Sequence, residues 1–279
     1  MTPFARLDLT KHSPTLWRVT FNNPPVNLLD GTMTNELNDV LSRAEMAGVK
    51  VIVFDSADPE FFMAHYDLSD SEELAYVLAH PDEVHPWTAL LIRLTKMPLV
   101  TISSVRGIAR GTGSEFLLAT DMRFASREKA VIGQFEIGMS AIPGGAPATR
   151  LPGLIGRGRT FEMLFGGLDL DGARAEQYGY VNRSFPDADL DGFVDGLASR
   201  IASFDLQTIK DIRHFVNIAT LRPDEEIKAQ MDAFFVALTR PAQQHVAQRL
   251  FESGLQERSE LERDLPHWVT RFQYAPAQK

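Results

Sequence analysis

Hydrophobic and polar residues alternate with two different periods in the first part of the chain. In Ala5–Leu9 and Leu16–Phe21 every second residue is apolar, which predicts two paired strands joined by a turn. The run Lys50–Asp55 is β-branched and has no polar alternation, as in a strand that is covered on both faces. Between these strands, Met33–Ala47 repeats its apolar residues at helical spacing. Strands and helices are therefore expected to mix from the start of the chain.

The middle of the chain continues this mixture. A helical pattern over Trp87–Thr95 is followed by an apolar strand at Leu99–Val105, a helix at Gly113–Thr120 and a further strand at Met122–Ala125. Strands that alternate with helices in this way indicate parallel strand pairs covered by helices. The pattern predicts the α/β fold class.

Strand patterns end near Leu206, and three helical stretches follow over residues 207–219, 223–238 and 243–256. We therefore expect an α/β core over residues 1–203 and a C-terminal α-helical region over residues 204–279. The amphipathic stretch Leu206–Arg271 is too long for one small sheet to cover. We expect it to be buried between chains, as an oligomerisation or lid region.

Composition excludes several classes of protein. The 28 basic and 37 acidic residues give a formal net charge of −9, which disfavours nucleic acid or an anionic membrane as a partner. The absence of cysteine rules out disulfides, thiolate metal sites and a cysteine nucleophile. No apolar run approaches the roughly 20 residues that cross a bilayer, and the N-terminus lacks a signal-peptide core. These features lead us to expect a cytoplasmic protein.

A glycine-broken turn before one acidic residue is the first candidate for chemistry. Gly107, Gly111 and Gly113 precede an apolar helix that carries Glu115 in its first turn. Glycines let the backbone approach a ligand, and a helix start leaves N–H groups that can hold an oxyanion. Taken alone, Glu115 is either a charge that complements the helix dipole or an acid/base with a shifted pKa.

Two other clusters of polar residues have simpler explanations. Glu136 stands in an apolar stretch, and as a single observation it is a surface acid at the end of a strand. The segment HPDEVH, residues 80–85, contains two histidines and two acids, but nothing places their side chains on one face. We interpret it as a solvated loop and predict no metal site.

Serine-elbow hydrolases, zinc proteases, P-loop enzymes and dinucleotide oxidoreductases have no motif in this chain. Five segments, in order, instead resemble the crotonase superfamily, the enoyl-CoA hydratase/isomerase family. PPVNLLD is similar to its P-x-x-N-x-L, FMAHYDL to F-x-A-G-x-D-L, and KMPLVTISSVRG to its strand that ends in V-x-G. GTGSEFLLATD is similar to G-G-G-x-E-L-x-x-x-x-D, and QFEIGMSAIPGG to Q-x-E-x-x-x-G-x-x-P-G. The resemblance runs from about Leu16 to Ala202.

The resemblance implies a spiral of ββα units and acyl-CoA chemistry through an enolate. It implies that the backbone N–H groups of Tyr66 and Thr112 grip the thioester oxygen, with Glu115 activating water and Glu136 delivering a proton. Coenzyme A enters as part of the substrate, and no cofactor is expected. The segments that match the family's substrate-contacting motifs add Ala64, His65, Asp67, Leu68, Gly111, Pro143 and Gly144 as substrate-binding residues.

Several residues depart from the family pattern. His65 and Thr112 replace glycines of the two oxyanion turns, which adds bulk and restricts the backbone. His65 has either a packing or capping role or acts as an additional acid/base. No basic residue precedes the proline of NNPPVN, where relatives place one near the CoA phosphates. We expect a substitute in Arg18, Lys96 or Arg110, or in a C-terminal helix of a neighbouring subunit.

The resemblance therefore implies an enoyl-CoA hydratase, a lyase, with an acyl-CoA substrate and a homotrimeric or hexameric assembly. An enoyl-CoA isomerase, a C–C bond hydrolase or a decarboxylase of the same family stays open, because one enolate-stabilising fold hosts several reactions. A member that binds acyl-CoA or a partner without catalysis is the alternative from another class. The two retained glutamates argue against it, and the substitutions at His65 and Thr112 argue for it.

Overall fold

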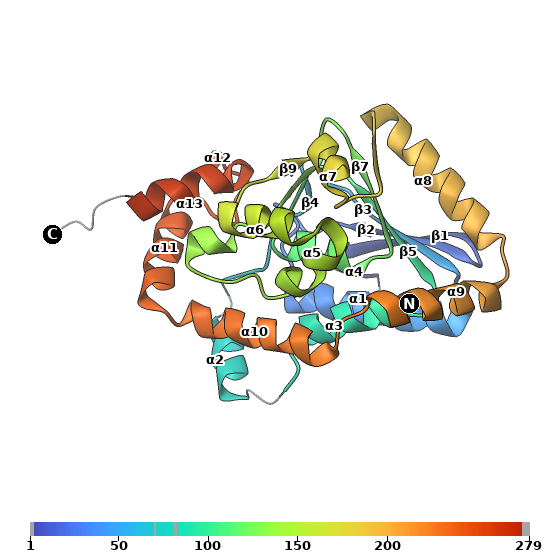
Figure 1. Ribbon diagram of the computed structural model, residues 1–279, viewed down its shortest axis with the longest axis horizontal. Coiled ribbons are helices and arrows are strands. Elements are labelled where there is room, and N and C mark those ends of the chain that lie inside the picture. The colour runs from blue at the N-terminus through green and yellow to red at the C-terminus, as the bar shows by residue number, and fades with distance from the viewer. Residues whose placement is uncertain (1–2, 70, 81–82, 275–279) are drawn as a thin grey trace.

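The computed structural model describes residues 3–69, 71–80 and 83–274. A six-stranded sheet runs through the middle of the molecule, in the order β1-β2-β3-β5-β7-β10 (Figure 1). The first two strands form an antiparallel hairpin, and every later neighbour is parallel, as the alternation of strands and helices predicts. Its strands are β1 (Leu7–Ser13), β2 (Leu16–Phe21), β3 (Val51–Ser56), β5 (Val100–Val105), β7 (Met122–Ser126) and β10 (Arg183–Phe185).

The first strand differs from the sequence prediction, since it covers Leu7–Ser13 and not Ala5–Leu9. It lies at the edge of the sheet, where only one neighbour is paired and one side faces solvent. Polar residues such as Lys11 and His12 are tolerated there, so the apolar alternation stops before the strand does.

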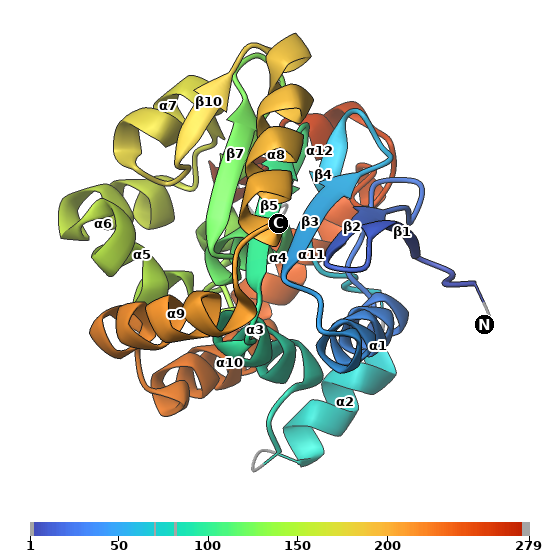
Figure 2. The same ribbon diagram turned by 90° about the vertical axis from the view of Figure 1, so that its right-hand side faces the viewer.

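Helices cover both faces of this sheet. On one face α8 lies along the strands (Figure 2) and buries Leu190 and Val194 against Val53 and Ile102. On the other face α1, α3 and α4 bury the largest apolar cluster, which includes the predicted helix face of residues 33, 37, 40, 41 and 44. The helices of the first 202 residues are α1 (Gly31–Ala47), α2 (Ser71–Ala79), α3 (Pro86–Lys96), α4 (Thr112–Ala119), α5 (Pro147–Ile155), α6 (Arg157–Gly166), α7 (Gly172–Tyr178) and α8 (Asp187–Ala202).

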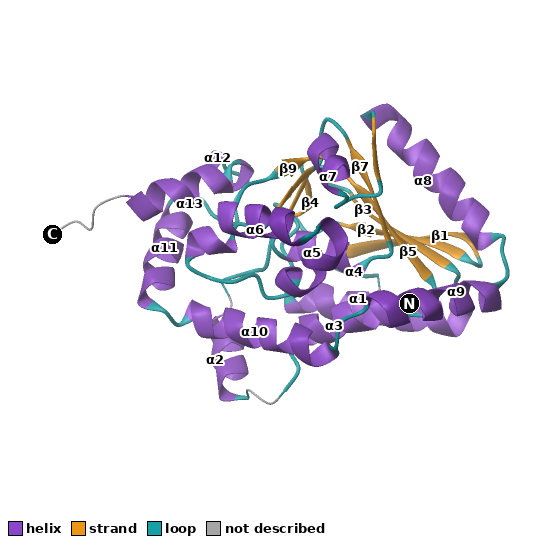
Figure 3. Cartoon of the chain, viewed as in Figure 1, coloured by secondary structure: helices purple, strands orange, loops and turns teal. Residues whose placement is uncertain are grey.

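A second sheet of four short strands, in the order β4-β6-β8-β9, lies beyond the first (Figure 3). Its strands are β4 (Phe61–Met63), β6 (Ile108–Arg110), β8 (Val131–Gly133) and β9 (Leu170–Asp171). The pairs β4/β6 and β6/β8 are parallel. The sequence pattern does not reveal these strands, because two or three residues are too few to display a period. This sheet positions the candidate site.

The C-terminal region is helical, as predicted, and its later helices lie at the end of the molecule away from α8 (Figure 1). The predicted helix over residues 243–256 is wrong at its end: α11 stops at Glu252, and Gly254 and Gln256 adopt positive φ angles. The helices are α9 (Leu206–Thr220), α10 (Asp224–Leu238), α11 (Pro241–Glu252), α12 (Glu260–Arg263) and α13 (Leu265–Tyr274). Within the described residues, no helix combines the length and apolar character needed to span a bilayer.

Candidate active site

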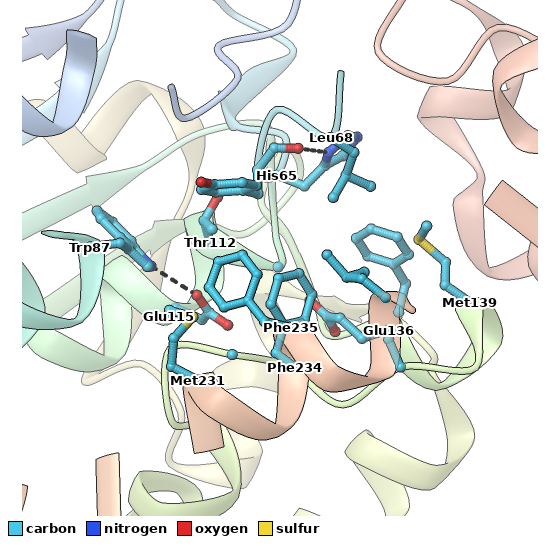
Figure 4. A pocket seen from close by; sticks show the side chains of 16 residues that line it. His65, Leu68, Trp87, Thr112, Glu115, Glu136, Met139, Met231, Phe234 and Phe235 are labelled. Atoms are coloured by element: carbon cyan, nitrogen blue, oxygen red, sulfur yellow. Dashed lines mark hydrogen bonds between the residues drawn. The ribbon is translucent and has the colours of Figure 1, made fainter. Parts of the chain in front are cut away.

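The carboxyl ends of three short parallel strands meet at one cavity of about 520 Å³, a volume that includes its opening to solvent. His65 and Tyr66 follow β4, Gly111 and Thr112 follow β6, and Glu136 follows β8. Parallel neighbours end at the same edge of a sheet, so residues far apart in the sequence converge there. The family resemblance assigns roles to Tyr66, Thr112, Glu115 and Glu136, and all four line this cavity. Figure 4 labels three of them, Thr112, Glu115 and Glu136.

The loop that carries Tyr66 is held by the proline-containing segment before α1. Leu29 donates its N–H to the His65 carbonyl at 2.9 Å, and the Asp67 N–H donates to the Leu29 carbonyl at 2.9 Å. In extended backbone, successive N–H groups point to opposite sides. The N–H of Tyr66 therefore points away from Leu29.

The second turn places Thr112 at the first position of α4, where backbone N–H groups lack intrahelical partners. Gly113 brings this helix start against β4, since a Cβ there would lie 2.2 Å from the Met63 carbonyl oxygen. Neither His65 nor Thr112 has a positive φ angle, so replacing the family's glycines has not strained either turn.

Glu115 is 2% exposed, and both of its carboxylate oxygens accept hydrogen bonds. The indole Nε1–H of Trp87 donates to Oε2 at 3.0 Å (Figure 4), and the Gly145 N–H donates to Oε1 at 2.6 Å. Burial raises the pKa of Glu115 above its ordinary value, while these two donors and the Arg150 guanidinium oppose the rise. The carboxylate is thus partnered in its charged form.

Arg150, on α5, is the buried counter-charge of Glu115. Burial lowers the pKa of Arg150 to about 10, and the Glu115 carboxylate opposes that decrease. A guanidinium with this pKa stays protonated near neutral pH. It therefore favours the ionised form of Glu115 without a direct hydrogen bond to it.

Glu136 begins η1 (Glu136–Met139), a short 3-10 turn, and is 7% exposed. Burial, and then the charge of Glu115, raises the pKa of Glu136 well above its ordinary value. With its nitrogen turned to the carboxyl group, the Gln134 amide donates to Glu136 Oε1 at 3.1 Å and Oε2 at 3.0 Å, while its oxygen accepts from Ser114 Oγ at 2.9 Å. Gln134 thus fixes the orientation of the Glu136 carboxyl group.

His65 lies in the cavity wall and is joined to the C-terminal region. Its Nε2 lies 3.1 Å from Oε1 and 3.2 Å from Oε2 of Glu262, a residue of α12 that is completely buried. Its Nδ1 lies 2.9 Å from the carbonyl oxygen of Tyr66. The resemblance left the role of His65 open, and the sequence contains no signal for its partner nearly 200 residues away.

One wall of the cavity comes from α10, whose residues the sequence did not place at the site. Figure 4 shows Phe234 and Phe235 projecting into the region between the two glutamates. The amphipathic period of residues 223–238 is the only signal in the sequence, and it does not say what the apolar face covers. The other lining residues that sequence reasoning missed are Trp87, Phe135, Met139, Ala141, Met231 and Leu238.

Most of the expected substrate-binding residues line the cavity, and three do not. His65, Leu68, Gly111 and Gly144 are part of the lining. Three lie outside it: Ala64, Asp67 and Pro143. Asp67 accepts from the Ser69 N–H at 2.9 Å and from Gln256 at 2.7 Å, and the Pro143 carbonyl accepts from Gln230 at 2.7 Å. The polar groups of Asp67 and Pro143 therefore hold the loops around the site in place.

Arg18 and Arg110, two expected substitutes for the missing phosphate-binding residue, form ion pairs with other side chains. Arg110 is 1% exposed and donates to Asp169 and to the Glu262 carbonyl. Arg18 pairs with Asp55 and Asp195 beside the large sheet. Lys96 is half exposed and pairs with Asp224 on the surface.

The histidine-containing segment over residues 80–85 is only partly covered, because Asp82 lies outside the described residues. His85 caps α3 by accepting from the Trp87 N–H at 3.2 Å. Within the described part of the chain, no cluster of three or more histidine or acidic side chains has the geometry of a metal site.

Comparison with known proteins agrees with this geometry. A sequence model described as enoyl-CoA hydratase/isomerase matches residues 11–262. A crystal structure from Streptomyces avermitilis, which carries a provisional assignment as an enoyl-CoA hydratase, is 33% identical and covers 98% of this chain and 100% of its own, with a TM-score of 0.88. The mouse enoyl-CoA hydratase domain-containing protein 2 is 32% identical over 178 residues, 63% of this chain and 60% of that protein. Rat methylglutaconyl-CoA hydratase is 33% identical over 138 residues, 48% of this chain and 42% of that protein. The chain belongs to the enoyl-CoA hydratase/isomerase family.

Proposed function

We propose that this protein hydrates a 2-enoyl-CoA thioester. The observation that carries the proposal is the pair of buried glutamates, Glu115 and Glu136, which share one cavity with the turns of Tyr66 and Thr112. An enolate develops its charge on the thioester oxygen only as the reaction proceeds. Two backbone N–H groups fixed around that oxygen therefore stabilise the transition state more than the substrate.

In the proposed reaction, Glu115 takes a proton from water as the water oxygen bonds to Cβ of the substrate. The electrons of the double bond move toward the carbonyl, and the thioester oxygen carries the negative charge between the N–H groups of Tyr66 and Thr112. Glu136 then gives its proton to Cα, and the carbonyl is restored. The water proton is then on Glu115 and Glu136 is ionised, so a proton passes from Glu115 to Glu136 by way of solvent and restores the pair. No cofactor is required.

The different environments of the two glutamates support this division of work. Glu115 has two hydrogen-bond donors and the Arg150 charge to stabilise its ionised form, as a base requires. Glu136 is buried beside the charge of Glu115, and the resulting rise in its pKa favours the protonated form, as an acid requires. Two carboxyl groups this close titrate together, so the roles belong to the pair.

The apolar side chains around the glutamates support an apolar acyl group. Leu68, Phe135 and Met139 line the cavity from the core, and Phe234 and Leu238 line it from α10. A charged acyl group would lose its hydration there without a free charge to pair with.

The test is a panel of 2-enoyl-CoA thioesters and of β-diketones without CoA, followed by loss of absorbance of the conjugated group. We expect turnover of enoyl thioesters and none of the diketones. Turnover of the diketones alone would replace the proposal with a C–C bond hydrolase. A product with a shifted double bond and no added water would replace it with an isomerase.

We also propose a homotrimeric or hexameric assembly. Helix α9 exposes Ile212, Phe215, Val216 and Ile218, each by more than half of its surface. An apolar row of this kind favours burial against another chain. Sedimentation that finds a stable monomer at micromolar concentration would contradict this.

A further inference from the structure

Among the residues that line the cavity, His65 is the one with a basic side chain, at a position where the family pattern has glycine. The ring is 2% exposed, and Phe135 covers one side of it at 5.5 Å between ring centroids. Glu262 reaches the ring from α12, far along the chain. This contact joins the turn that carries Tyr66 to α12, beside the hydrogen bond between Asp67 and Gln256 at 2.7 Å.

Both ring nitrogens of His65 face oxygen atoms that accept hydrogen bonds. Nδ1 faces the Tyr66 carbonyl at 2.9 Å, and Nε2 faces the Glu262 carboxyl group at 3.1–3.2 Å. A neutral imidazole has one donor and one acceptor nitrogen, so it satisfies only one of these contacts. The geometry fits an imidazolium, with a proton on each nitrogen.

Glu262 is arranged as the ionised partner. Its Oε2 also accepts the Gln256 N–H at 2.8 Å, a contact that favours the charged carboxylate. Burial disfavours the charged form of His65, but the Glu262 carboxylate outweighs this and holds the pKa of His65 above its ordinary value. The same pairing outweighs the effect of burial on Glu262 and lowers the pKa of that group.

Two other charged groups lie near the His65 ring, and their effects on the charge of His65 oppose each other. Arg110 of β6 opposes the charge of His65, but its guanidinium pairs with Asp169 at 2.7 Å. Asp67, on the same loop, favours the cation.

On the cavity side, both glutamates line the same space as the ring. Glu136 lies across Gly111, since a Cβ added to that glycine would contact its Oε1 at 2.9 Å and the His65 Cβ at 3.3 Å. Glu115 lines the same cavity. Negative charge on either group favours the imidazolium.

We propose that His65 is a positioning residue for the oxyanion hole, and that it acts as an imidazolium held by Glu262. The Nδ1–H donates to the carbonyl of Tyr66 and fixes the peptide plane between Tyr66 and Asp67, next to the plane that contains the Tyr66 N–H. When His65 loses its proton, one of its two hydrogen bonds is lost and the loop is released from α12. This inference rests on the proposed enolate chemistry for its catalytic consequence.

The first test is the pH dependence of kcat on crotonyl-CoA, in wild type and in E262Q. Removing the opposing charge from a buried imidazolium lowers its pKa by about 1–3 units. We therefore expect the alkaline limb of E262Q to move to lower pH by about 1–3 units, with kcat affected more than KM. In the double variant H65Q/E262Q no imidazole titrates at this position, so the limb that moved in E262Q is absent and any alkaline limb that remains belongs to Glu136. An alkaline limb that stays in place in E262Q, with only a lower Tm, would overturn the inference.

The matched control is E260Q, which removes the same charge from an exposed position of the same helix. It should leave both kcat and the pH profile unchanged.

The second test needs no substrate and separates this inference from the proposed function. The chain has five tyrosines, so selective ¹⁵N-tyrosine labelling gives few amide signals, and Y66F assigns the one from Tyr66. We expect the Tyr66 amide shift to titrate with His65 in wild type and at lower pH in E262Q. A Tyr66 amide that does not respond to pH would overturn the inference whether or not the protein hydrates an enoyl thioester.

Discussion

The Nε1–H of Trp87 donates to Oε2 of Glu115 at 3.0 Å, within a core where both residues are almost completely buried. Trp87 lies on α3, and Glu115 lies on α4 of the glycine-rich turn. A core aromatic residue thereby takes part in the chemistry of the site. Hydrogen bonds to charged groups are about twice as strong as those between neutral groups, so this contact favours the ionised form of Glu115.

Replacing Trp87 with phenylalanine removes this donor. The pKa of Glu115 is then expected to rise further, because burial raises it and one of the hydrogen bonds that lower it is gone. The proposed base must be ionised, so activity is present above its pKa and lost as the pH falls through it. We expect the acid limb of kcat to move to higher pH and kcat at pH 6 to fall roughly 10- to 100-fold. W17F, a similar loss from another buried tryptophan, should keep the wild-type profile. Equal acid limbs in W87F and wild type would contradict the prediction.

Replacing Glu136 with glutamine removes the proposed proton donor and keeps the shape of the side chain. Loss of a positioned acid typically costs about 10²–10⁴-fold in rate. We expect that decrease in the hydration of crotonyl-CoA, measured by absorbance. In wild type the raised pKa of Glu136 means that activity is present below that pKa and lost as the pH rises through it. Unchanged turnover of E136Q would remove Glu136 from the mechanism.

Gly145 is expected to tolerate no side chain. A Cβ at this position would lie 2.3 Å from Oε2 of Glu115, whose other oxygen accepts the Gly145 N–H. We expect G145A to displace the carboxylate and lower kcat at least tenfold, since an error of about 1 Å in a reacting group can cost about 100-fold. G153A is the matched control, because a Cβ there meets nothing within 4 Å on the same stretch of chain. Similar kinetics of the two variants would contradict the structure around Glu115.

Phe234 of α10 is expected to limit the length of the acyl group, since it lines the cavity and is only half-buried. We expect F234A to raise kcat/KM for longer enoyl thioesters relative to crotonyl-CoA by about 10-fold or more, on the scale of one or two methylene groups. V236A, on the exposed face of the same helix, should leave this ratio unchanged. An unchanged ratio in F234A would place the acyl group elsewhere in the cavity.

Asp187 is expected to contribute to acid stability. Its hydrogen bond with Lys129, and its pairing with Arg106, lower the pKa of Asp187 to about 2. Because the folded pKa lies below the unfolded value, the contribution is present above about pH 4 and lost as the pH falls toward about 2. We expect the Tm of D187N to be lower than that of wild type at pH 6, with the two curves converging near pH 2. The control is D189N, which changes an exposed residue in the same turn of α8, and its Tm should match that of wild type at every pH.

Part of this protein is readable from local sequence. The alternating strand Leu16–Phe21, the buried run before Asp55 and the apolar face of Met33–Ala47 all appear as predicted elements, because their periods are long enough to show which face is buried. The family motifs also indicated the turns at Tyr66 and Thr112 and both glutamates, four residues that line one cavity in the structure. The acid at position 136 shows the limit of single residues: alone it resembled a surface charge, and only the five ordered motifs indicated a site.

Tertiary structure decided what surrounds those residues. The sheet of β4, β6 and β8 brings Tyr66, Thr112 and Glu136 to one edge, although its strands are too short to show a period. The contacts of His65 with Glu262 and of Trp87 with Glu115 join segments whose distance apart in the chain carries no local signal. The spacing of apolar residues along a helix such as α10 shows that one face is buried, because those residues form a continuous apolar stripe. Which cavity that face covers depends on packing between distant segments, and no local pattern records it.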